Sequence, residues 1–485
     1  MAEGRGGVVK KFLDHTTPSA RADEASRLFL DRAATPPPAE EGSQFQNFLS
    51  LFIRVGFWPD FRNCPPSLDC ICFHRLSPNE ASMRNVYSAP LRAAAAAVVV
   101  FSLSIQGQQP APRDTSPRVL DVQGGKIRVV TVATGLFHPW SLAFADARTL
   151  LVAEKNGKLR MIRDGMLLPD NVWTSPTPAG QGGDALHGVA IHPQFAQNNL
   201  VYMSYPKPGP QGTTLAISRG RLKGATLENV QEIFVADAWE TGGNLAGRIL
   251  LGPDASLYVT VGDRDRICCN GTDDNSLRLK AQDLGNHVGK TLRLRDDGTV
   301  PPNNPFVGRA GAKPEVFTYG HRNGYGLAIN PETGELWQAE IGPMGGDEVN
   351  TLLPGHNYGW PLVSTGRNYT GTLVSDQPWA RPGMDNPRIH WVPSISPSSI
   401  MFYTGDKFPR WKNNLFVGAL TTRQLVRVAF NQPSQAERRE GLLIPMDIRP
   451  RDVQQSPDGY IYVATEQASG GNTADGMVLR IEPQP

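Results

Sequence analysis

The sequence predicts an all-β fold, a six-bladed β-propeller that runs from about Val119 to the C-terminus of the 485-residue chain. No stretch of useful length has helical periodicity. The last repeat lies close to the C-terminus, which favours a closed ring over an open solenoid or a β-sandwich. A pattern of apolar run, polar turn and second apolar run recurs six times, beginning at Ser141, Gly188, Arg248, Gly326, Ser399 and Asp452.

Each copy of the pattern predicts two neighbouring antiparallel strands. The turn between the two runs contains Pro-Asp or Pro-Glu in three of the copies, which is typical of a hairpin. A four-stranded blade cannot bury both of its faces alone, so neighbouring blades stack around a ring. The longest insertions run from Cys268 to Leu284 and from Asn357 to Pro393. We expect both to lie over one end of the ring.

The segment before the propeller contains an export signal in an unusual place. Residues 83–108 begin with Met83 and a short basic region and continue into the apolar run from Ala93 to Leu103, which is the layout of a secretory signal peptide. We therefore expect residues 1–82 to be an upstream extension that is disordered or not translated, and residues 109–118 to be a Pro-rich linker. The alternative is an N-terminal extension with an internal membrane anchor.

The composition supports a folded chain that is exported. Hydrophobic residues make up 40% of the chain and charged residues 19%, which allows a sizeable core. The formal net charge of +2 gives no reason to expect a nucleic-acid partner, because phosphate binding needs a concentrated basic face. We expect a periplasmic or secreted protein with no stable membrane span once the signal is removed. The sequence does not indicate an oligomeric state.

The polar motifs lie where loops enter and leave the repeated runs. Four of them follow in a fixed order: GHRN-x-x-G from Gly320, GP-x-x-x-DE-x-N from Gly342, NYGWP from Asn357 and R-x-RDV from Arg449. This ordered set resembles the soluble sugar dehydrogenases that depend on pyrroloquinoline quinone (PQQ), the glucose/sorbosone dehydrogenase family. The resemblance extends from about Val132 to Glu482. It implies a six-bladed propeller that oxidises the C1 hydroxyl of aldose sugars to lactones, with PQQ and calcium, and passes electrons to an external acceptor.

The same resemblance assigns four residues to the cofactor. PQQ is a planar tricarboxylate, and planar guanidinium groups suit carboxylates better than ammonium groups do. Arg449 and Arg451 match the family's carboxylate-binding pair, and they point the same way on an extended segment. Arg322 and Asn323 match the residues that polarise the quinone oxygens, where negative charge develops.

A calcium loop is also implied by the resemblance. The ion prefers six to eight oxygen ligands. The backbone carbonyls of Gly342, Pro343 and Tyr358 are candidate ligands, together with the carboxylates of Asp347 and Glu348. The plainer alternative is a Gly-rich acidic turn between two strands.

The catalytic position departs from the family pattern. In the family, the general base is a histidine that lies a few residues before the G-R-[IL] of the third blade. In this sequence, Asn244 occupies that position. An amide does not accept a proton at useful pH, although it can hold a sugar hydroxyl. Gln181 matches a substrate-side glutamine, and Asp263 matches the acidic residue beside the base. Thr421 aligns with a lysine that binds the cofactor in the family, so this sequence has one cation fewer at that position.

Three explanations of Asn244 remain open at the level of sequence. Another group could serve as base, either His187 or Glu240. The loop could be shifted, so that the chemistry differs. The protein could also keep the fold and act as a non-catalytic sugar- or polymer-binding propeller. A metal-dependent lactone hydrolase is a further function found on six-bladed propellers, but the sequence shows no clear set of acids that would converge on one metal.

Overall fold

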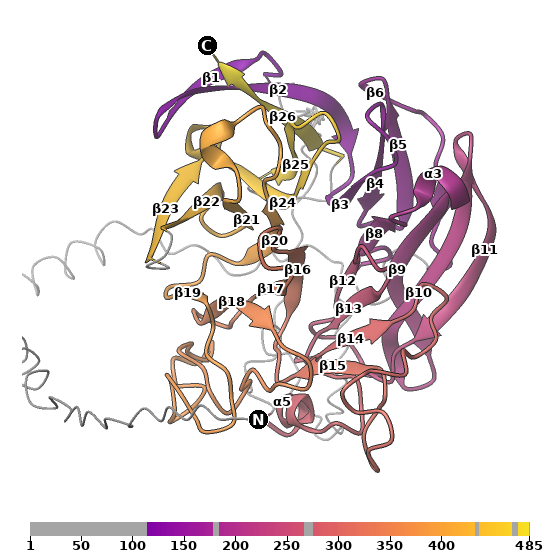
Figure 1. Cartoon of the computed structure of the whole chain (residues 1–485), viewed down its shortest axis with the longest axis vertical. Helices are drawn as coiled ribbons and strands as arrows, with labels where there is room; N and C mark the ends of the chain where they lie inside the picture. The colour runs from indigo at the N-terminus through magenta and orange to yellow at the C-terminus, as the bar shows by residue number, and fades with distance from the viewer. Residues whose placement is uncertain (1–113, 178–183, 266–274, 432–435, 468–473, 485) are drawn as a thin grey trace, which may run out of the picture. The chain divides into compact units, whose positions relative to one another are not determined.

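The structure is a computed structural model that describes residues 114–177, 184–265, 275–431, 436–467 and 474–484. Six antiparallel sheets stand around a common axis, as Figure 1 shows, and this confirms the predicted six-bladed propeller. The expected upstream extension, the signal peptide and residues 109–113 of the expected linker lie outside the described residues. Each sheet extends outward from the axis, and the strand at one end of the sheet lies next to the axis (Figure 1).

The first three blades follow one another along the chain. Blade 1 contains β3 (Pro139–Phe144), β4 (Thr149–Glu154), β5 (Lys158–Arg163), β6 (Met166–Leu167) and β7 (Trp173–Thr174). Blade 2 contains β8 (Gly188–Ile191), β9 (Leu200–Gly209), β10 (Gly212–Lys223) and β11 (Thr226–Val235). Blade 3 contains β12 (Ala246–Leu251), β13 (Leu257–Val261), β14 (Lys290–Leu294) and β15 (Val316–Tyr319).

The other three blades complete the ring. Blade 4 contains β16 (Gly324–Ile329), β17 (Leu336–Glu340), β18 (Asp347–Leu352) and β19 (Ile389–Trp391). Blade 5 contains β20 (Pro397–Phe402), β21 (Leu415–Ala419), β22 (Gln424–Asn431) and β23 (Ala436–Leu442). Blade 6 contains β24 (Ile448–Gln455), β25 (Ile461–Gln467), β26 (Gly476–Gln484), β2 (Gly125–Leu136) and β1 (Arg118–Val122). The short helices are α3 (Phe195–Asn198), α5 (Asn275–Leu279), η1 (Lys280–Gln282), η2 (Pro409–Trp411) and η3 (Ile444–Met446).

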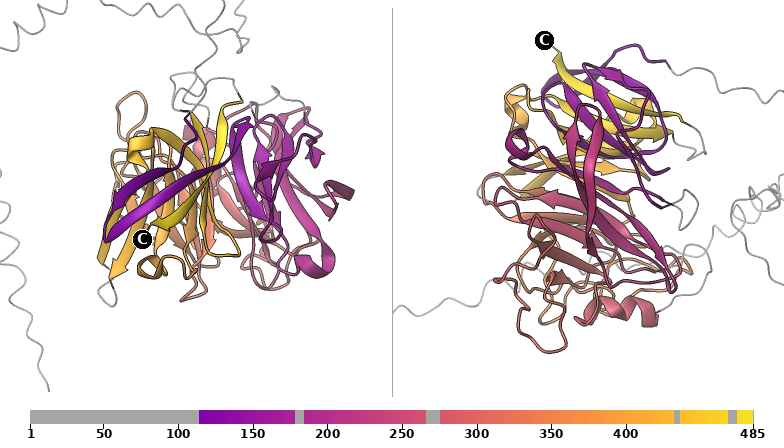
Figure 2. Two further views of the ribbon diagram at one scale, coloured as in Figure 1. Left: turned by 90° about the horizontal axis from the view of Figure 1, so that it is seen from above. Right: turned by 90° about the vertical axis from the view of Figure 1, so that its right-hand side faces the viewer.

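The two ends of the chain close the ring within blade 6. Strand β2, from the N-terminal side, pairs antiparallel with β26, and Val129 lies opposite Ile481. Figure 2 shows the indigo strands β1 and β2 beside the yellow C-terminal strands. Because β2 and β26 pair, the ring has no open end at which its blades could pair with another chain.

The apolar core is divided among the interfaces between blades. One cluster joins Phe416 of blade 5 to Val463 and Leu479 of blade 6, and all three are fully buried. Another joins Tyr202 of blade 2 to Val259 of blade 3. These strands are rich in β-branched and aromatic residues, which pack well on a pleated surface. The core therefore depends on stacking, as the repeat pattern predicts.

The inner strands approach one another closely, and glycine permits this. A Cβ atom on Gly326 of β16 would lie 2.8 Å from the backbone nitrogen of Ile400 in β20. A Cβ atom on Gly188 of β8 would lie 3.0 Å from the carbonyl oxygen of Gly247 in β12. Both positions lie at the start of repeated runs, so the sequence pattern places small residues where the ring is narrowest.

The two long insertions contact each other beside blades 3 and 4. Arg278 of α5 donates to Asn368 Oδ1 at 2.8 Å, and Gln282 and Asn357 exchange two hydrogen bonds. Residues 266–274 of the first insertion lie outside the described part of the chain. Within the described residues, none of the helices has the length and apolar character needed to cross a bilayer.

Candidate functional site

A narrow cavity on the propeller axis receives one side chain from each of the six blades. Its volume is about 10 Å³, about the space that one water molecule needs, and Leu420 completes its lining. The inner strands or the loops before them supply the other six residues, in chain order Trp140, His187, Arg248, Tyr325, Ser398 and Arg451. Since each blade presents the first residues of its inner strand here, residues far apart in sequence meet at one point.

Arg248 fixes the middle of this cavity. Its guanidinium lies 3.1 Å from the buried carboxylate of Asp452 and donates to the carbonyls of Tyr325 and Ser398. Asp452 also accepts the backbone N–H of Leu142. These contacts tie blades 1, 3, 4, 5 and 6 together across the axis, so Arg248 has a structural role as well as a place in the cavity lining.

Arg449 and Arg451 meet at a buried carboxylate on the neighbouring strand. Arg451 Nη2 donates to Glu466 of β25, and Arg449 Nε lies 3.3 Å from the same oxygen. The guanidinium of Arg451 also stacks 4.4 Å from the ring centroid of Trp140. His138 contacts the other oxygen of Glu466. Burial tends to raise the pKa of Glu466, but His138 and the two arginines outweigh it and lower the pKa to about 2.

Arg322 and Asn323 lie at the start of β16, on the other side of the axis. Arg322 Nη1 donates to the carbonyls of Ile341 and Gly342, and its guanidinium lies 5.4 Å from the ring centroid of Trp360. Asn323 is also buried. The backbone N–H of Arg322 donates to Glu340, which fixes the entry of the strand.

The four residues predicted to hold the cofactor share an unusual property. Each of them carries a buried polar atom that makes no hydrogen bond among the described residues: Arg322 Nε, Asn323 Oδ1, Arg451 Nε and Arg449 Nε, the last of which has only the 3.3 Å ion-pair contact with Glu466. A buried donor or acceptor without a partner costs about 1–3 kcal/mol, so native proteins rarely keep several of them in one region without a ligand. The three guanidinium donors fit an anionic, oxygen-rich guest.

Tyr325 links the two sides of this region. Burial raises the pKa of its phenol, and the nearby charge of Asp184 raises it further. The Asn323 amide and the guanidinium charges of Arg451 and Arg322 oppose these effects. One hydroxyl therefore lies within electrostatic range of both arginines, and the predicted cofactor residues of blades 4 and 6 lie around the same end of the axis.

Asn244 and Asp263 lie side by side and share a hydrogen bond. Asp263 is the acidic residue expected beside the catalytic position. Asn244 Nδ2 donates to Asp263 Oδ1 at 3.0 Å, and Trp360 Nε1 donates to Asp263 Oδ2 at 2.8 Å. Asp263 is fully buried, and burial together with the charge of Asp265 raises its pKa to about 6 against the lowering effect of Arg322. Asn244 is not part of the axial cavity lining. Gln181 lies outside the described residues.

Two alternative catalytic groups occupy different surroundings. His187 lines the axial cavity, and its Nδ1 lies 2.5 Å from the carbonyl oxygen of Ala246. Glu240 instead lies in an ion pair with Lys280 on η1, at 2.5 Å. Thr421, which replaces the family lysine, is exposed and shares a hydrogen bond with Ser396. Blade 5 thus contributes Leu420 to the cavity and no cation.

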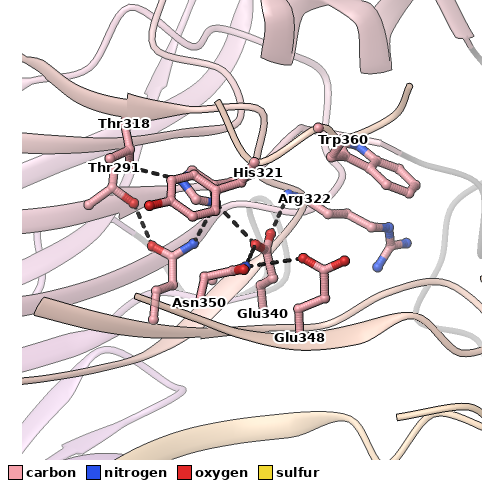
Figure 3. A network of polar contacts seen from close by, with 12 residues as sticks. Thr291, Thr318, His321, Arg322, Glu340, Glu348, Asn350 and Trp360 are labelled. Atoms are coloured by element: carbon pink, nitrogen blue, oxygen red, sulfur yellow. Dashed lines mark hydrogen bonds and ion pairs between the residues drawn. The ribbon is translucent and has the colours of Figure 1, made fainter. Parts of the chain in front are cut away.

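A second cavity adjoins Arg322 and contains two carboxylates. Glu340 and Glu348 both line it, and Asn350 Nδ2 donates to each of them, at 2.8 and 3.1 Å (Figure 3). Burial and the charge of Glu340 raise the pKa of Glu348 well above its ordinary value. His321 lies behind Glu340, 3.0 Å from its Oε1 (Figure 3). Two buried like charges of this kind favour a bound cation.

The structure separates the predicted calcium ligands into two groups. Glu348, Gly342 and Tyr358 line the second cavity. Asp347 is fully buried, and its oxygens accept the backbone N–H groups of Gly342, Ile395 and Ser396 and the hydroxyl of Ser394. This carboxylate joins blade 4 to the loop that enters blade 5, and it has no oxygen free for a metal. Pro343 follows Gly342 in the same turn, and no cluster of three or more His, Cys, Asp or Glu side chains suited to a metal occurs in the described ranges.

Three residues of the site escape prediction from the sequence. Glu466 ends the last repeated copy, and only its contact with two arginines on the neighbouring strand reveals its role. Trp140 and Trp360 cover Arg451 and Arg322. The Trp that follows Pro139 and the Trp of NYGWP are visible in the sequence, but their partners lie in other blades.

Comparison with known proteins agrees with the fold. The family model described as Glucose / Sorbosone dehydrogenase matches residues 136–477. The chain is 34% identical to the aldose sugar dehydrogenase YliI of Escherichia coli, over 74% of this chain and 93% of that protein. A crystal structure of a glucose dehydrogenase superposes with a TM-score of 0.66 at 36% identity, over 73% of this chain and 98% of that one. A PQQ-bound aldose sugar dehydrogenase from Streptomyces coelicolor superposes with a TM-score of 0.57 at 26% identity, over 77% of this chain and 99% of that one. The chain belongs to the glucose/sorbosone dehydrogenase family.

Proposed function

We propose that this protein is a periplasmic or secreted PQQ-dependent sugar dehydrogenase. It oxidises the C1 hydroxyl of aldoses to lactones and passes the electrons to an external acceptor. The observation that carries the proposal is the set of four buried polar atoms on Arg322, Asn323, Arg449 and Arg451 that make no hydrogen bond among the described residues. Membership of the family, and relatives named as aldose sugar dehydrogenases, support the same activity.

The residues present fit this cofactor. When bound, PQQ would supply an ortho-quinone that accepts a hydride, that is, one hydrogen with its electron pair. Arg449 and Arg451 would bind its carboxylates, and Glu466 holds both guanidinium groups at that position. Arg322 and Asn323 would face the quinone oxygens, where fixed donors stabilise developing negative charge.

Calcium would bind beside Arg322, in the second cavity. The carboxylate of Glu348 and the carbonyls of Gly342, Pro343 and Tyr358 are the ligands we propose. The like charges of Glu340 and Glu348 support a cation at this place. We leave Asp347 out of the ligand set, because four donors, on Gly342, Ser394, Ile395 and Ser396, already bond its two oxygens.

Asn244 and Gln181, which match substrate-side positions of the family, would hold hydroxyl groups of the sugar. Asp263 fixes the amide of Asn244 through the 3.0 Å hydrogen bond, so the amide oxygen is oriented away from the carboxylate and is available to accept from a hydroxyl. Asp263 is thus a positioning residue in this proposal and not a proton acceptor for the sugar.

Asn244 also favours a second candidate, a propeller that binds a sugar or polymer without oxidising it. The test is to add PQQ and calcium to the purified protein and follow dye reduction with several aldoses. The first candidate predicts dye reduction, and the second predicts aldose binding by calorimetry with no turnover. Absence of PQQ binding at micromolar concentrations would contradict the first candidate.

A further inference from the structure

We infer that His187, on the loop that enters β8, is the general base that replaces the histidine missing at position 244. The inference rests on the proposed function and names the group that completes it. His187 comes from blade 2, whereas Asn244 precedes the inner strand of blade 3. The base would therefore have moved to the neighbouring blade while the reaction stayed the same.

The hydrogen bond of the imidazole ring decides which nitrogen can accept a proton. Nδ1 lies 2.5 Å from the carbonyl oxygen of Ala246, and a carbonyl oxygen only accepts, so Nδ1 carries the hydrogen. Nε2 of a neutral ring is then a bare acceptor. The nearest carboxylate oxygen, on Asp184, lies 3.8 Å from Nε2, which is too far for a hydrogen bond.

The ring is held in place from three sides. Trp140 packs edge-on against it, with ring centroids 5.8 Å apart. A Cβ atom on Gly247 would lie 3.1 Å from Cβ and 3.3 Å from Cγ of His187, and Gly247 has a φ of +95° that side chains rarely adopt. The third contact is the hydrogen bond to Ala246. The backbone of β12 is thus shaped to accept this ring, a feature that a surface histidine does not need.

The location of His187 agrees with the role. It lines the axial cavity together with Arg451, which we propose binds the cofactor, and Tyr325. Asn244 does not line that cavity, and its amide is bound to Asp263. Of the residues in the described part of the cavity, His187 alone carries a side chain that can take up a proton near neutral pH, because the others are arginines, aromatic residues, Ser398 and Leu420.

The surroundings keep the imidazole neutral. Burial lowers the pKa of His187, and the charges of Lys155 and Arg264 lower it further, against the raising effects of Asp184 and the Ala246 carbonyl. Arg248 and Arg451 line the same cavity and are cations, and the phenol of Tyr325 stays protonated because its pKa is raised. A histidine in this setting is unprotonated at pH 7 and ready to act as base.

The chemistry balances with His187 in this role. The O–H bond of the C1 hydroxyl breaks, and its proton goes to Nε2. The C1–H bond breaks, and its hydrogen and electron pair go as hydride to the quinone of the proposed cofactor. A C1=O bond forms, so the aldose becomes a lactone. Asp184 stabilises the resulting imidazolium by its charge.

The test compares His187→Gln with a matched control, His356→Gln. His356 is exposed, its side chain is hydrogen-bonded to Asp385, and it lies outside both cavities. In the holoenzyme with PQQ and calcium, His187→Gln should lower kcat at least 100-fold, since general bases contribute roughly 10²–10⁴-fold. Its affinities for PQQ and aldose, measured by calorimetry, should stay within about 3-fold of wild type because binding and proton transfer are separate roles. His356→Gln should match wild type in all three measurements.

A second readout does not depend on turnover. ¹⁵N spectra of the wild-type protein, with the His187 signals assigned by loss in His187→Gln or His187→Asn, should show a neutral ring protonated at Nδ1 at pH 7. A ring protonated at Nε2, or one that is charged at pH 7, would overturn the inference. So would unchanged kcat in a His187→Gln enzyme that binds PQQ. Absence of PQQ binding by wild type would overturn the proposed function as well, whereas the other two outcomes leave it standing.

Discussion

Glu466 shows how one buried carboxylate organises the cofactor end of the axis. It contacts Arg449, Arg451 and His138. The positions of the two arginines that we propose bind the cofactor therefore depend on Glu466. Removing one partner of a buried charged group is costly, because the remaining charges stay buried without compensation. The Nε atoms of both arginines are buried and make no hydrogen bond among the described residues.

We predict that Glu466→Gln lowers the free energy of unfolding by about 2–4 kcal/mol at pH 7, as expected for a broken buried ion pair. The folded pKa of Glu466, about 2, lies below its ordinary value of 4.5. The stabilisation is therefore present above pH 4.5 and is lost as the pH falls toward 2. Urea unfolding at pH 7 and at pH 3 should show the difference between wild type and variant shrinking at the lower pH.

The matched control is Asp406→Asn. Asp406 forms an ion pair with Lys412, and its side chain is 92% exposed. Exposed ion pairs contribute about 0–1 kcal/mol, so this variant should unfold almost as wild type does. Equal effects of the two variants would contradict the assigned role of Glu466.

Arg451 permits a second test at the residue scale. Arg451→Lys keeps the charge but loses the planar group that stacks on Trp140 and can bind a carboxylate with two donors. We predict PQQ affinity about 10- to 100-fold lower, equivalent to roughly 1.4–2.8 kcal/mol. Arg439→Lys is the control, because Arg439 stacks 4.6 Å from Trp391 on an outer strand, away from the axis. A fluorescence titration with PQQ that finds equal affinities for the two variants would contradict the site.

At the scale of elements, the inner strands set the width of the axial cavity. We predict that Gly326→Ala destabilises the protein by about 1–3 kcal/mol, the range for overpacked positions, because its Cβ would meet the backbone of β20 at 2.8 Å. Gly285→Ala is the control, since its nearest neighbour is the flexible, exposed side chain of Asp283. Thermal unfolding should show a clear drop for the first variant and a drop of less than about 0.5 kcal/mol for the second, as at other surface positions.

The sequence predicts these elements well where a repeat is present and poorly where contacts are long-range. Each repeated copy corresponds to an inner strand and the strand that follows it, from β3–β4 to β24–β25. The short outer strands β7 and β19 have no such pattern. Asp347 illustrates the limit at the site: its spacing in the motif suggests a metal ligand, but the turn after β19 brings three N–H and O–H donors within reach of its Oδ2. Only the folded backbone places those donors there.

At the scale of the whole molecule, the ring is closed by strands from both ends of the chain. β2 pairs with β26 over most of its length, so blade 6 is complete only when residues 118–136 are present. We predict that a chain starting at residue 114 unfolds cooperatively, because every strand in the described part of the chain begins at Arg118 or later. A chain starting at Phe137 should lose the cooperative transition in thermal unfolding. Retention of that transition would contradict closure by β1 and β2.

The proposed function depends most on whether one flat, anionic molecule is bound from two blades, by Arg322, Asn323, Arg449 and Arg451. A crystal structure of the protein grown with PQQ and calcium tests this most directly. The account predicts PQQ at the end of the axis, with its carboxylates on Arg449 and Arg451 and its quinone oxygens facing Arg322 and Asn323. PQQ bound elsewhere, or an axis end free of PQQ at saturating concentration, would contradict it.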